Sequence, residues 1–168
     1  VGQELPLHDN FARLLTYTFS RLLRSPVEVK TAFIDQTTYR EAMESLSNPS
    51  CTYQFRMRPC KGHAFVDFEL PLVFGYLDKR FGGRGDVDGQ DPRTVTPIEV
   101  YEFHHLAKNI FSDLEATWEP IIQMQIQDIE LETNPDFMQI TNASEIVLLL
   151  CFEVNDEYLK GRIKLCYP

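Results

Sequence analysis

The chain has 168 residues, of which 43% are hydrophobic and 12% aromatic, and its formal net charge is −9. A chain of this length fits one domain with a sizeable core, and its composition excludes global disorder. The acidic balance argues against nucleic acid or anionic lipid as a partner, and its simplest consequence is solubility.

Apolar runs in the chain are too short for a membrane helix, which needs about 20 residues. The longest, residues 146–152, is typical of a buried strand, and no signal peptide is visible. We therefore expect no direct membrane insertion. Because the chain starts at Val1, we also expect it to be a fragment of a longer protein.

Four cysteines, Cys51, Cys60, Cys151 and Cys166, lack the close pairing of a zinc site or a redox site. Three of them fall in strand-like stretches, where a free cysteine behaves as a small hydrophobe. The pattern predicts structural cysteines in a reducing, cytoplasmic compartment, with no metal and no cofactor.

The first predicted elements occupy residues 8–71. Residues 8–24 predict an amphipathic helix, whose apolar face carries Phe11, Leu14, Leu15, Thr18, Phe19 and Leu22. After Pro26 come an extended stretch at 27–35 and a short helical piece at 38–46. Alternation from Cys51 to Met57, a turn at 58–62 and alternation from Ala64 to Leu70 then predict a β-hairpin.

The same succession recurs over residues 96–168. Thr96-Pro97-Ile98-Glu99 is a capping box with proline at the first helical position, so a second helix begins there. Its apolar face has the spacing of the first helix: Phe103, Leu106, Ala107, Ile110, Phe111 and Leu114. Pro120, an extended stretch at 121–129, a short helical piece at 134–140 and a hairpin with its turn at 155–157 complete the half.

Each half therefore reads helix, strand, short helix, strand, strand. The two halves, about 8–71 and 96–168, predict a single α/β domain over 1–168: a six-stranded sheet with packed helices and pseudo-twofold symmetry, that is, an α/β sandwich. The alternating pattern suits strands with one covered face, and it does not suit a doubly wound parallel sheet.

A helix at 72–81 and a glycine-rich loop at 82–93 join the two halves. The loop lacks the flanking residues of a phosphate cradle. Arg84-Gly85-Asp86 spells an adhesion tripeptide, but three residues recur by chance. Two interpretations stay open: a tolerant connector, and a docking loop whose glycines let a partner approach closely while Arg84 donates hydrogen bonds.

Catalytic motifs are missing from the sequence. His104 and His105 are adjacent on a helix and cannot chelate one metal together, and no serine or cysteine sits in a nucleophile motif. The carboxylates of the second long helix resemble a solvated face: Glu99, Glu102, Asp113, Glu115 and Glu119. The sequence therefore predicts a protein that is not an enzyme.

Several stretches together resemble the middle domain of the FliM family of flagellar motor switch proteins. In chain order these are residues 23–27 (LRSPV), Gly82-Gly83-Arg84-Gly85, Thr96-Pro97-Ile98-Glu99, Trp118, residues 132–137 (ETNPDF) with Gln139-Ile140, and Leu165-Cys166-Tyr167-Pro168. The resemblance covers nearly the whole chain, and it implies a fold like that of CheC.

The resemblance implies a subunit of the cytoplasmic C-ring, at the flagellar basal body on the cytoplasmic face of the inner membrane. Implied partners are the middle domain of FliG, neighbouring FliM subunits, FliN and phosphorylated CheY, which biases rotation. The family's GGxG loop falls on Gly82, Gly83, Arg84 and Gly85. Because a loop alone is too small for an interface, we expect support from Asp78, Lys79 and Arg80.

An alternative with the same fold is a phosphatase of phosphorylated CheY, of the CheC and CheX type. Those enzymes resemble one another in a helical Glu-x-x-Asn element. In the long helices here, Asn10 and Asn109 follow Leu7 and Leu106 at that spacing, so the element is absent and the phosphatase is disfavoured.

Overall fold

The polypeptide runs twice through one succession of elements in the computed structural model, which describes residues 4–87 and 92–168. The first pass comprises α1 (Glu4–Leu23), β1 (Glu28–Thr38), α2 (Tyr39–Glu44), β2 (Cys51–Arg58) and β3 (His63–Phe68). Helix α3 (Leu70–Arg80) follows. The second pass comprises α4 (Pro97–Trp118), β4 (Gln125–Glu132), the 3₁₀ turn η1 (Pro135–Phe137), β5 (Ile146–Asn155) and β6 (Lys160–Tyr167).

The strands of the described residues form one antiparallel sheet in the order β1-β5-β6-β3-β2-β4. The counterparts in the two halves are β1 and β4, β2 and β5, and β3 and β6. If each strand is replaced by its counterpart, the same order results, read from the opposite edge of the sheet. The first strand of each half therefore lies at an edge, paired with the middle strand of the other half. This arrangement confirms the predicted pseudo-twofold α/β sandwich.

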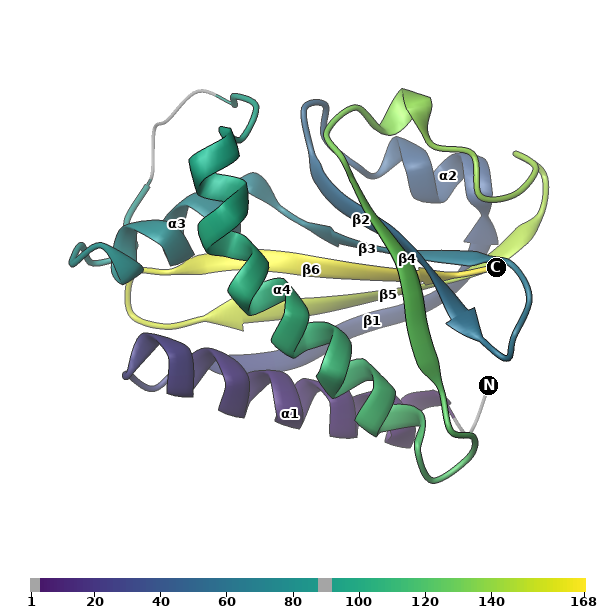
Figure 1. Ribbon diagram of the computed structural model, residues 1–168, viewed down its shortest axis with the longest axis horizontal. Coiled ribbons are helices and arrows are strands. Elements are labelled where there is room, and N and C mark those ends of the chain that lie inside the picture. The colour runs from purple at the N-terminus through teal and green to yellow at the C-terminus, as the bar shows by residue number, and fades with distance from the viewer. Residues whose placement is uncertain (1–3, 88–91) are drawn as a thin grey trace.

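The sheet lies between two layers of unequal size (Figure 1). Helices α1, α3 and α4 cover one face and enclose the main core, in which Phe11, Phe68 and Phe103 are buried. Helix α2 and the η1 segment cover part of the other face over a smaller cluster that includes Tyr39 and Phe65. The apolar stripes predicted for the two long helices thus meet the same face of the sheet.

The start of α4 is fixed as its sequence predicts. The Thr96 side chain accepts the Glu99 N–H at 3.3 Å, and the Glu99 carboxylate accepts the Thr96 N–H at 2.9 Å. Arg93 adds a bidentate ion pair to Glu99 at 2.7 Å. The hydrogen bonds from Arg93 and Thr96 outweigh partial burial and lower the pKa of Glu99 to about 2.

Several predicted boundaries differ from the structure: α1 begins at Glu4 and not at residue 8, β1 continues to Thr38 and not to residue 35, and α3 begins at Leu70 and not at residue 72. Strand β4 begins at Gln125, not at residue 121, because the Ile121 and Ile122 N–H groups donate to the Trp118 carbonyl and prolong the helix end as a turn. The short helical piece expected at 134–140 is only the single turn η1, where the Asn134 side chain accepts the Asp136 N–H at 3.0 Å.

The prediction that the carboxylates of α4 are a solvated face was wrong for several of them. Glu99 caps the helix, and Glu115 accepts the Ile126 N–H at 2.8 Å. Asp113 accepts a hydrogen bond from Thr18 of α1 at 2.6 Å. Burial raises the pKa of Asp113 to about 6, against the opposing effects of Thr18 and Arg21. These carboxylates therefore join α4 to its neighbours.

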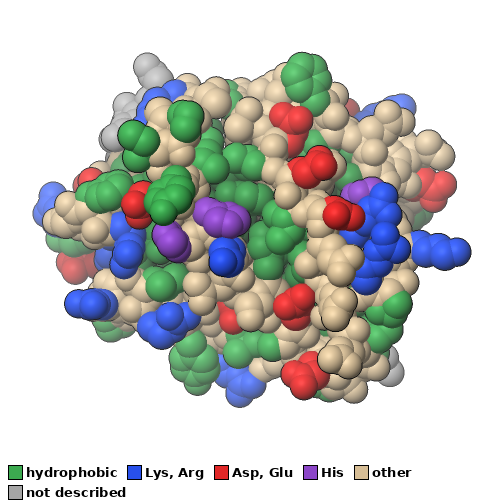
Figure 2. All heavy atoms as spheres, viewed as in Figure 1, with side chains coloured by type: hydrophobic (Ala, Val, Ile, Leu, Met, Phe, Trp, Pro, Cys, Tyr) green, Lys and Arg blue, Asp and Glu red, His purple; other side chains and the backbone are tan. Residues whose placement is uncertain are grey.

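The face covered by α1 and α4 carries charges of both signs, with hydrophobic side chains between them (Figure 2). All four cysteines are free, and only Cys60 is exposed. In the described ranges, no three histidine, cysteine or carboxylate side chains gather as metal ligands would. None of the helices there combines the length and apolar character needed to cross a bilayer.

Candidate functional site

Helix α3 ends in a backbone motif that favours a glycine. The Gly82 N–H donates to the Lys79 carbonyl at 3.2 Å, and the Gly83 N–H donates to the Asp78 carbonyl at 2.8 Å. This is a Schellman motif with Gly82 in the left-handed region, at φ +98°. A Cβ added to Gly82 would meet nothing within 4 Å, so the backbone conformation and not a close contact favours glycine here, and the space outside it is open.

The next two glycines serve contacts within the domain. A Cβ on Gly83 would lie 2.1 Å from the Asp78 carboxylate, which also accepts the Gly85 N–H at 2.9 Å. Gly85 is buried, at φ +90°, and a Cβ there would lie 2.8 Å from the stem of Lys79. Asp78 therefore folds the loop back over the end of α3.

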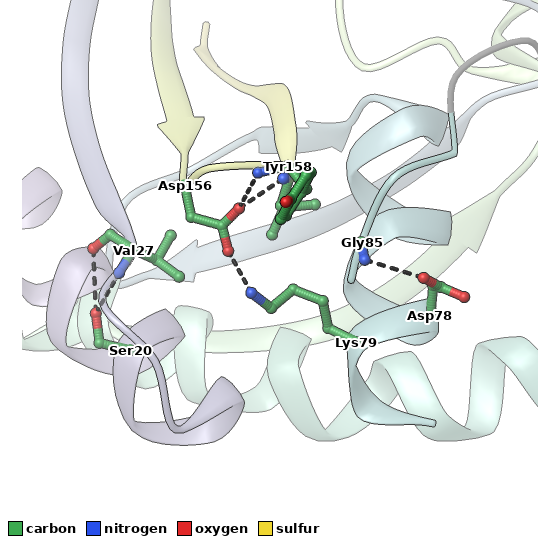
Figure 3. Close-up of polar contacts among 8 residues, drawn as sticks. Ser20, Val27, Asp78, Lys79, Gly85, Asp156 and Tyr158 are labelled. Atoms are coloured by element: carbon green, nitrogen blue, oxygen red, sulfur yellow. Dashed lines mark hydrogen bonds and ion pairs between the residues drawn. The ribbon is translucent and has the colours of Figure 1, made fainter. Parts of the chain in front are cut away.

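The β5–β6 turn packs against the same helix end (Figure 3). The Lys79 ammonium forms an ion pair with the Asp156 carboxylate, whose other oxygen accepts the N–H groups of Tyr158 at 2.8 Å and Leu159 at 2.6 Å. Although burial acts to raise it, the net effect of these hydrogen bonds is a lowered pKa of Asp156. Leu159 is fully buried beside Gly75 and Gly85.

Arg84 and Tyr158 form the outward part of this assembly. The Arg84 guanidinium lies 4.7 Å from the centre of the Tyr158 ring, a cation–π contact. Both side chains are exposed, as is Phe81 at the last turn of α3, which has 67% of its surface accessible. A hollow of about 150 Å³ lies between the loop and the turn, lined by Pro71, Gly85, Asp86, Val87, Glu157, Tyr158 and Lys160.

The end of α1 borders the site. Arg80 donates to the Leu22 carbonyl at 3.0 Å, which joins the C-terminal ends of α3 and α1. Arg24, just past α1, is left-handed at φ 53°, and the Ser20 hydroxyl bonds both the N–H and the carbonyl of Val27 (Figure 3). The LRSPV segment therefore makes a tight corner between α1 and β1.

The structure brings all the predicted site residues together, but they play different parts. Gly82 and Arg84 face outward, whereas Gly83 and Gly85 make room for contacts within the domain. Asp78, Lys79 and Arg80 each have an intramolecular partner and hold neighbouring segments. Residues 88–91 of the predicted glycine-rich loop lie outside the described residues.

Sequence reasoning missed the contribution of the β5–β6 turn. Asp156 was placed in a turn, and an aspartate that accepts the N–H two residues later is a common turn signal. The pairing of that aspartate with Lys79 joins residues far apart in the sequence, and no local pattern indicates it. No sequence motif indicated that Tyr158 belongs to the site.

The arrangement is suited to binding. Its cation and carboxylate are paired with each other, and its outward groups are an aromatic ring, a guanidinium and open backbone. On α4, the position three residues before Asn109 is Leu106, which is fully buried. Asn109 itself accepts from Arg21 at 3.0 Å and donates to the His105 carbonyl at 2.7 Å.

Comparisons with known proteins agree on one family. The family model for the flagellar motor switch protein FliM matches residues 4–168. The FliM of Borreliella burgdorferi is 32% identical over 161 residues, which cover 96% of this chain and 46% of that protein. This chain thus spans about half the length of the curated relatives it matches.

Solved structures show the same likeness. A chain of the FliG–FliM complex from H. pylori superposes with a TM-score of 0.91 at 28% identity, covering 97% of this chain and 89% of that chain. The chemotaxis protein CheX from Vibrio vulnificus, at 9% identity and a TM-score of 0.62, shares the fold alone. The chain belongs to the FliM family of flagellar motor switch proteins.

Proposed function

We propose that this chain is the middle domain of a flagellar motor switch subunit and that it binds FliG through the edge formed by Gly82–Gly85 and the end of α3. In this proposal the domain is not an enzyme. It stands beside neighbouring copies in the cytoplasmic C-ring of the basal body, with FliN among its partners, and it passes the signal of phosphorylated CheY to FliG.

The observation that carries the proposal is the form of the α3 end. Gly82 is left-handed with open space outside it, so the backbone of a partner can approach there. Around it the loop is held by Asp78, and a pre-ordered loop loses little entropy on binding. The H. pylori relative with the same fold was solved as a FliG–FliM complex, which supports FliG as the partner.

A single substitution tests the site without disturbing the loop. Gly82→Asn keeps a residue type that tolerates the left-handed region, and it places a side chain in the open space outside the loop. Gly83 is unsuitable for this purpose because its substitution would strike the Asp78 carboxylate. The matched control is Gly62→Asn in the β2–β3 turn, where φ is +92°.

Titration calorimetry against the FliG middle domain of the same organism gives the readout. The proposal predicts saturable binding by the wild-type chain and by Gly62→Asn, and at least tenfold weaker binding by Gly82→Asn. Circular dichroism spectra should be the same for all three. Equal affinities for the three proteins would place the FliG site elsewhere, and absence of wild-type binding would contradict FliG as the partner.

The phosphatase alternative is not favoured. Asn10 of α1 and Asn109 of α4 are preceded three residues earlier by Leu7 and Leu106, so neither makes the Glu-x-x-Asn element of CheC-type enzymes, and Leu106 belongs to the core. The glutamate that would orient the attacking water at this spacing is therefore missing from both helices. The likeness to CheX therefore concerns the fold and does not extend to its site.

A further inference from the structure

The β5–β6 turn is built into the candidate docking edge as firmly as the glycine loop. A Cβ on Gly75 would lie 2.5 Å from Leu159, and a Cβ on Gly161 would lie 3.1 Å from the backbone of Leu72. Both ends of the turn thus touch α3 at distances that exclude a larger residue. The turn and the loop form one surface, with Tyr158 projecting from the turn and Arg84 from the loop.

We infer that the β5–β6 turn is the second part of the docking surface, with the stacked pair Arg84–Tyr158 as its anchor and Asp156 as the residue that positions it. This inference rests on the proposed function, since it concerns the same site and partner. It assigns the turn to the same interface, although Asp156 lies 77 residues beyond Lys79 in the sequence.

The anchor indicates what the partner must bring. The few residues that carry most of the binding energy in protein interfaces are enriched in tryptophan, tyrosine and arginine. Arg84 and Tyr158 are exposed here, as is Phe81. The Arg84 guanidinium lies over the Tyr158 ring, 4.7 Å from its centre. A guanidinium fixed in this way presents its N–H groups in the fork that carboxylates fit.

The surface therefore suits a partner segment with a carboxylate for Arg84 and an apolar side chain for Tyr158 and Phe81. The turn itself is held by Asp156, which orders the backbone N–H groups of Tyr158 and Leu159 and binds Lys79. Because Lys79 also packs its stem against Gly85, its ion pair with Asp156 helps to link the turn to the loop.

Four variants test the anchor against the FliG middle domain, each titrated beside the wild-type chain. We expect Tyr158→Ala and Arg84→Ala to weaken binding about tenfold or more, as interface anchors do. Tyr158→Phe keeps the ring and should bind as the wild type. Arg84→Lys keeps the charge and loses the fork, and it should bind several-fold more weakly than the wild type. Lys61→Ala, in the exposed β2–β3 turn, is the control and should bind normally.

The positioning role of Asp156 has a readout in the free protein. Asp156→Asn retains an oxygen for the turn but loses the ion pair with Lys79, and Lys79→Met loses the same pair from the other side. Either variant should speed hydrogen exchange of the Gly85 N–H and weaken FliG binding several-fold. The double variant should bind FliG no more weakly than the weaker-binding single variant, because both substitutions remove the same ion pair.

The outcomes separate the inference from the proposed function. Wild-type binding that Gly82→Asn weakens and Tyr158→Ala leaves unchanged would overturn the inference and keep the proposed function. Additive losses in the Lys79–Asp156 double variant would overturn the positioning role of Asp156. Absence of binding by the wild-type chain would overturn both proposals. Loss in Tyr158→Ala with recovery in Tyr158→Phe is the result the inference predicts.

Discussion

The two hairpin turns of the domain are counterparts in the two halves, yet they are built differently. The β5–β6 turn buries Leu159 completely and pairs Asp156 with Lys79 of α3. The β2–β3 turn, residues 59–62, is exposed throughout and borders a cavity of about 640 Å³. At that end, polar contacts hold the domain: the Tyr167 hydroxyl bonds His8 at 2.9 Å and Trp118 at 3.1 Å.

The difference comes from what lies beside each turn. Helix α3 follows β3 directly and packs along β6, so its last turn reaches the β5–β6 turn (Figure 1). In the described part of the chain, no helix takes the same place beside the β2–β3 turn. The turn of one duplicated hairpin therefore packs against α3 in the proposed docking edge, while the turn of its counterpart is exposed.

The largest effect should come from filling the close approach between β6 and α3. Gly161→Ala would bring a Cβ within 2.5 Å of the Leu72 side chain and 3.1 Å of its backbone. We expect it to lower the free energy of unfolding by about 2–3 kcal/mol. At the exposed turn, a Cβ on Gly62 would lie 3.6 Å from Pro168, an ordinary contact, so Gly62→Ala is opposed by the positive φ and should cost about 1 kcal/mol. Urea unfolding measures both, and equal costs would contradict the difference between the turns.

The second-largest effect on stability should come from the polar contacts at the opposite end of the domain. Tyr167→Phe removes the hydroxyl that accepts the Trp118 indole N–H and bonds His8. A buried donor left without its partner costs stability, so we expect a loss of about 1–2 kcal/mol in thermal unfolding. FliG binding should be unchanged, because this residue lies away from the docking edge. A binding defect in a folded Tyr167→Phe variant would show that the two ends are coupled.

A smaller, pH-dependent effect is expected at Asp156. Its folded-state pKa is lowered, so the stabilisation is present in full above the pKa of the unfolded chain and is lost as pH falls through the folded-state value. Asp156→Asn should therefore cost about 1 kcal/mol at pH 7 and at pH 6, and less below pH 4. Unfolding of both proteins in urea across this range checks the trend. A constant difference would show that the Lys79 ion pair contributes nothing.

The smallest effect should have the opposite sign. Arg24, just past α1, is in the left-handed region, as Gly82 is just past α3. Because glycine adopts this conformation without strain, Arg24→Gly should raise the free energy of unfolding by about 0.5–1 kcal/mol. Gly82→Ala, the reverse change at α3, should lower it by a similar amount. Thermal unfolding of both variants provides the comparison, and a destabilised Arg24→Gly would mean that the arginine side chain has a stabilising contact.

Local patterns predicted most of the fold. The capping box at Thr96, the two apolar helix faces and the alternating hairpins are signals between residues close in sequence, and the structure contains each of them. The predicted start of β4 was wrong because the Trp118 carbonyl accepts hydrogen bonds from the next backbone N–H groups before the strand begins. Alternation of Ile122, Met124 and Ile126 starts within that turn and gave no sign of the boundary.

The candidate site was predictable only in part. The glycines and Arg84 were visible as a motif, and the preceding helix placed Asp78, Lys79 and Arg80 beside them. The pairings of Lys79 with Asp156 and of Arg84 with Tyr158 depend on how the second half folds back onto α3. Likewise, the sequence does not separate Gly82, which faces open space, from Gly83, which makes room for a carboxylate.

Amide chemical-shift mapping of this chain during titration with the FliG middle domain tests the central claim most directly. The account predicts that the largest shifts fall on Phe81–Gly85 and on Asp156–Leu159 together, with little change at Cys60–Gly62. Shifts centred on the β2–β3 turn, or no shifts at all under saturating FliG, would contradict the assignment of the docking edge to the α3 end.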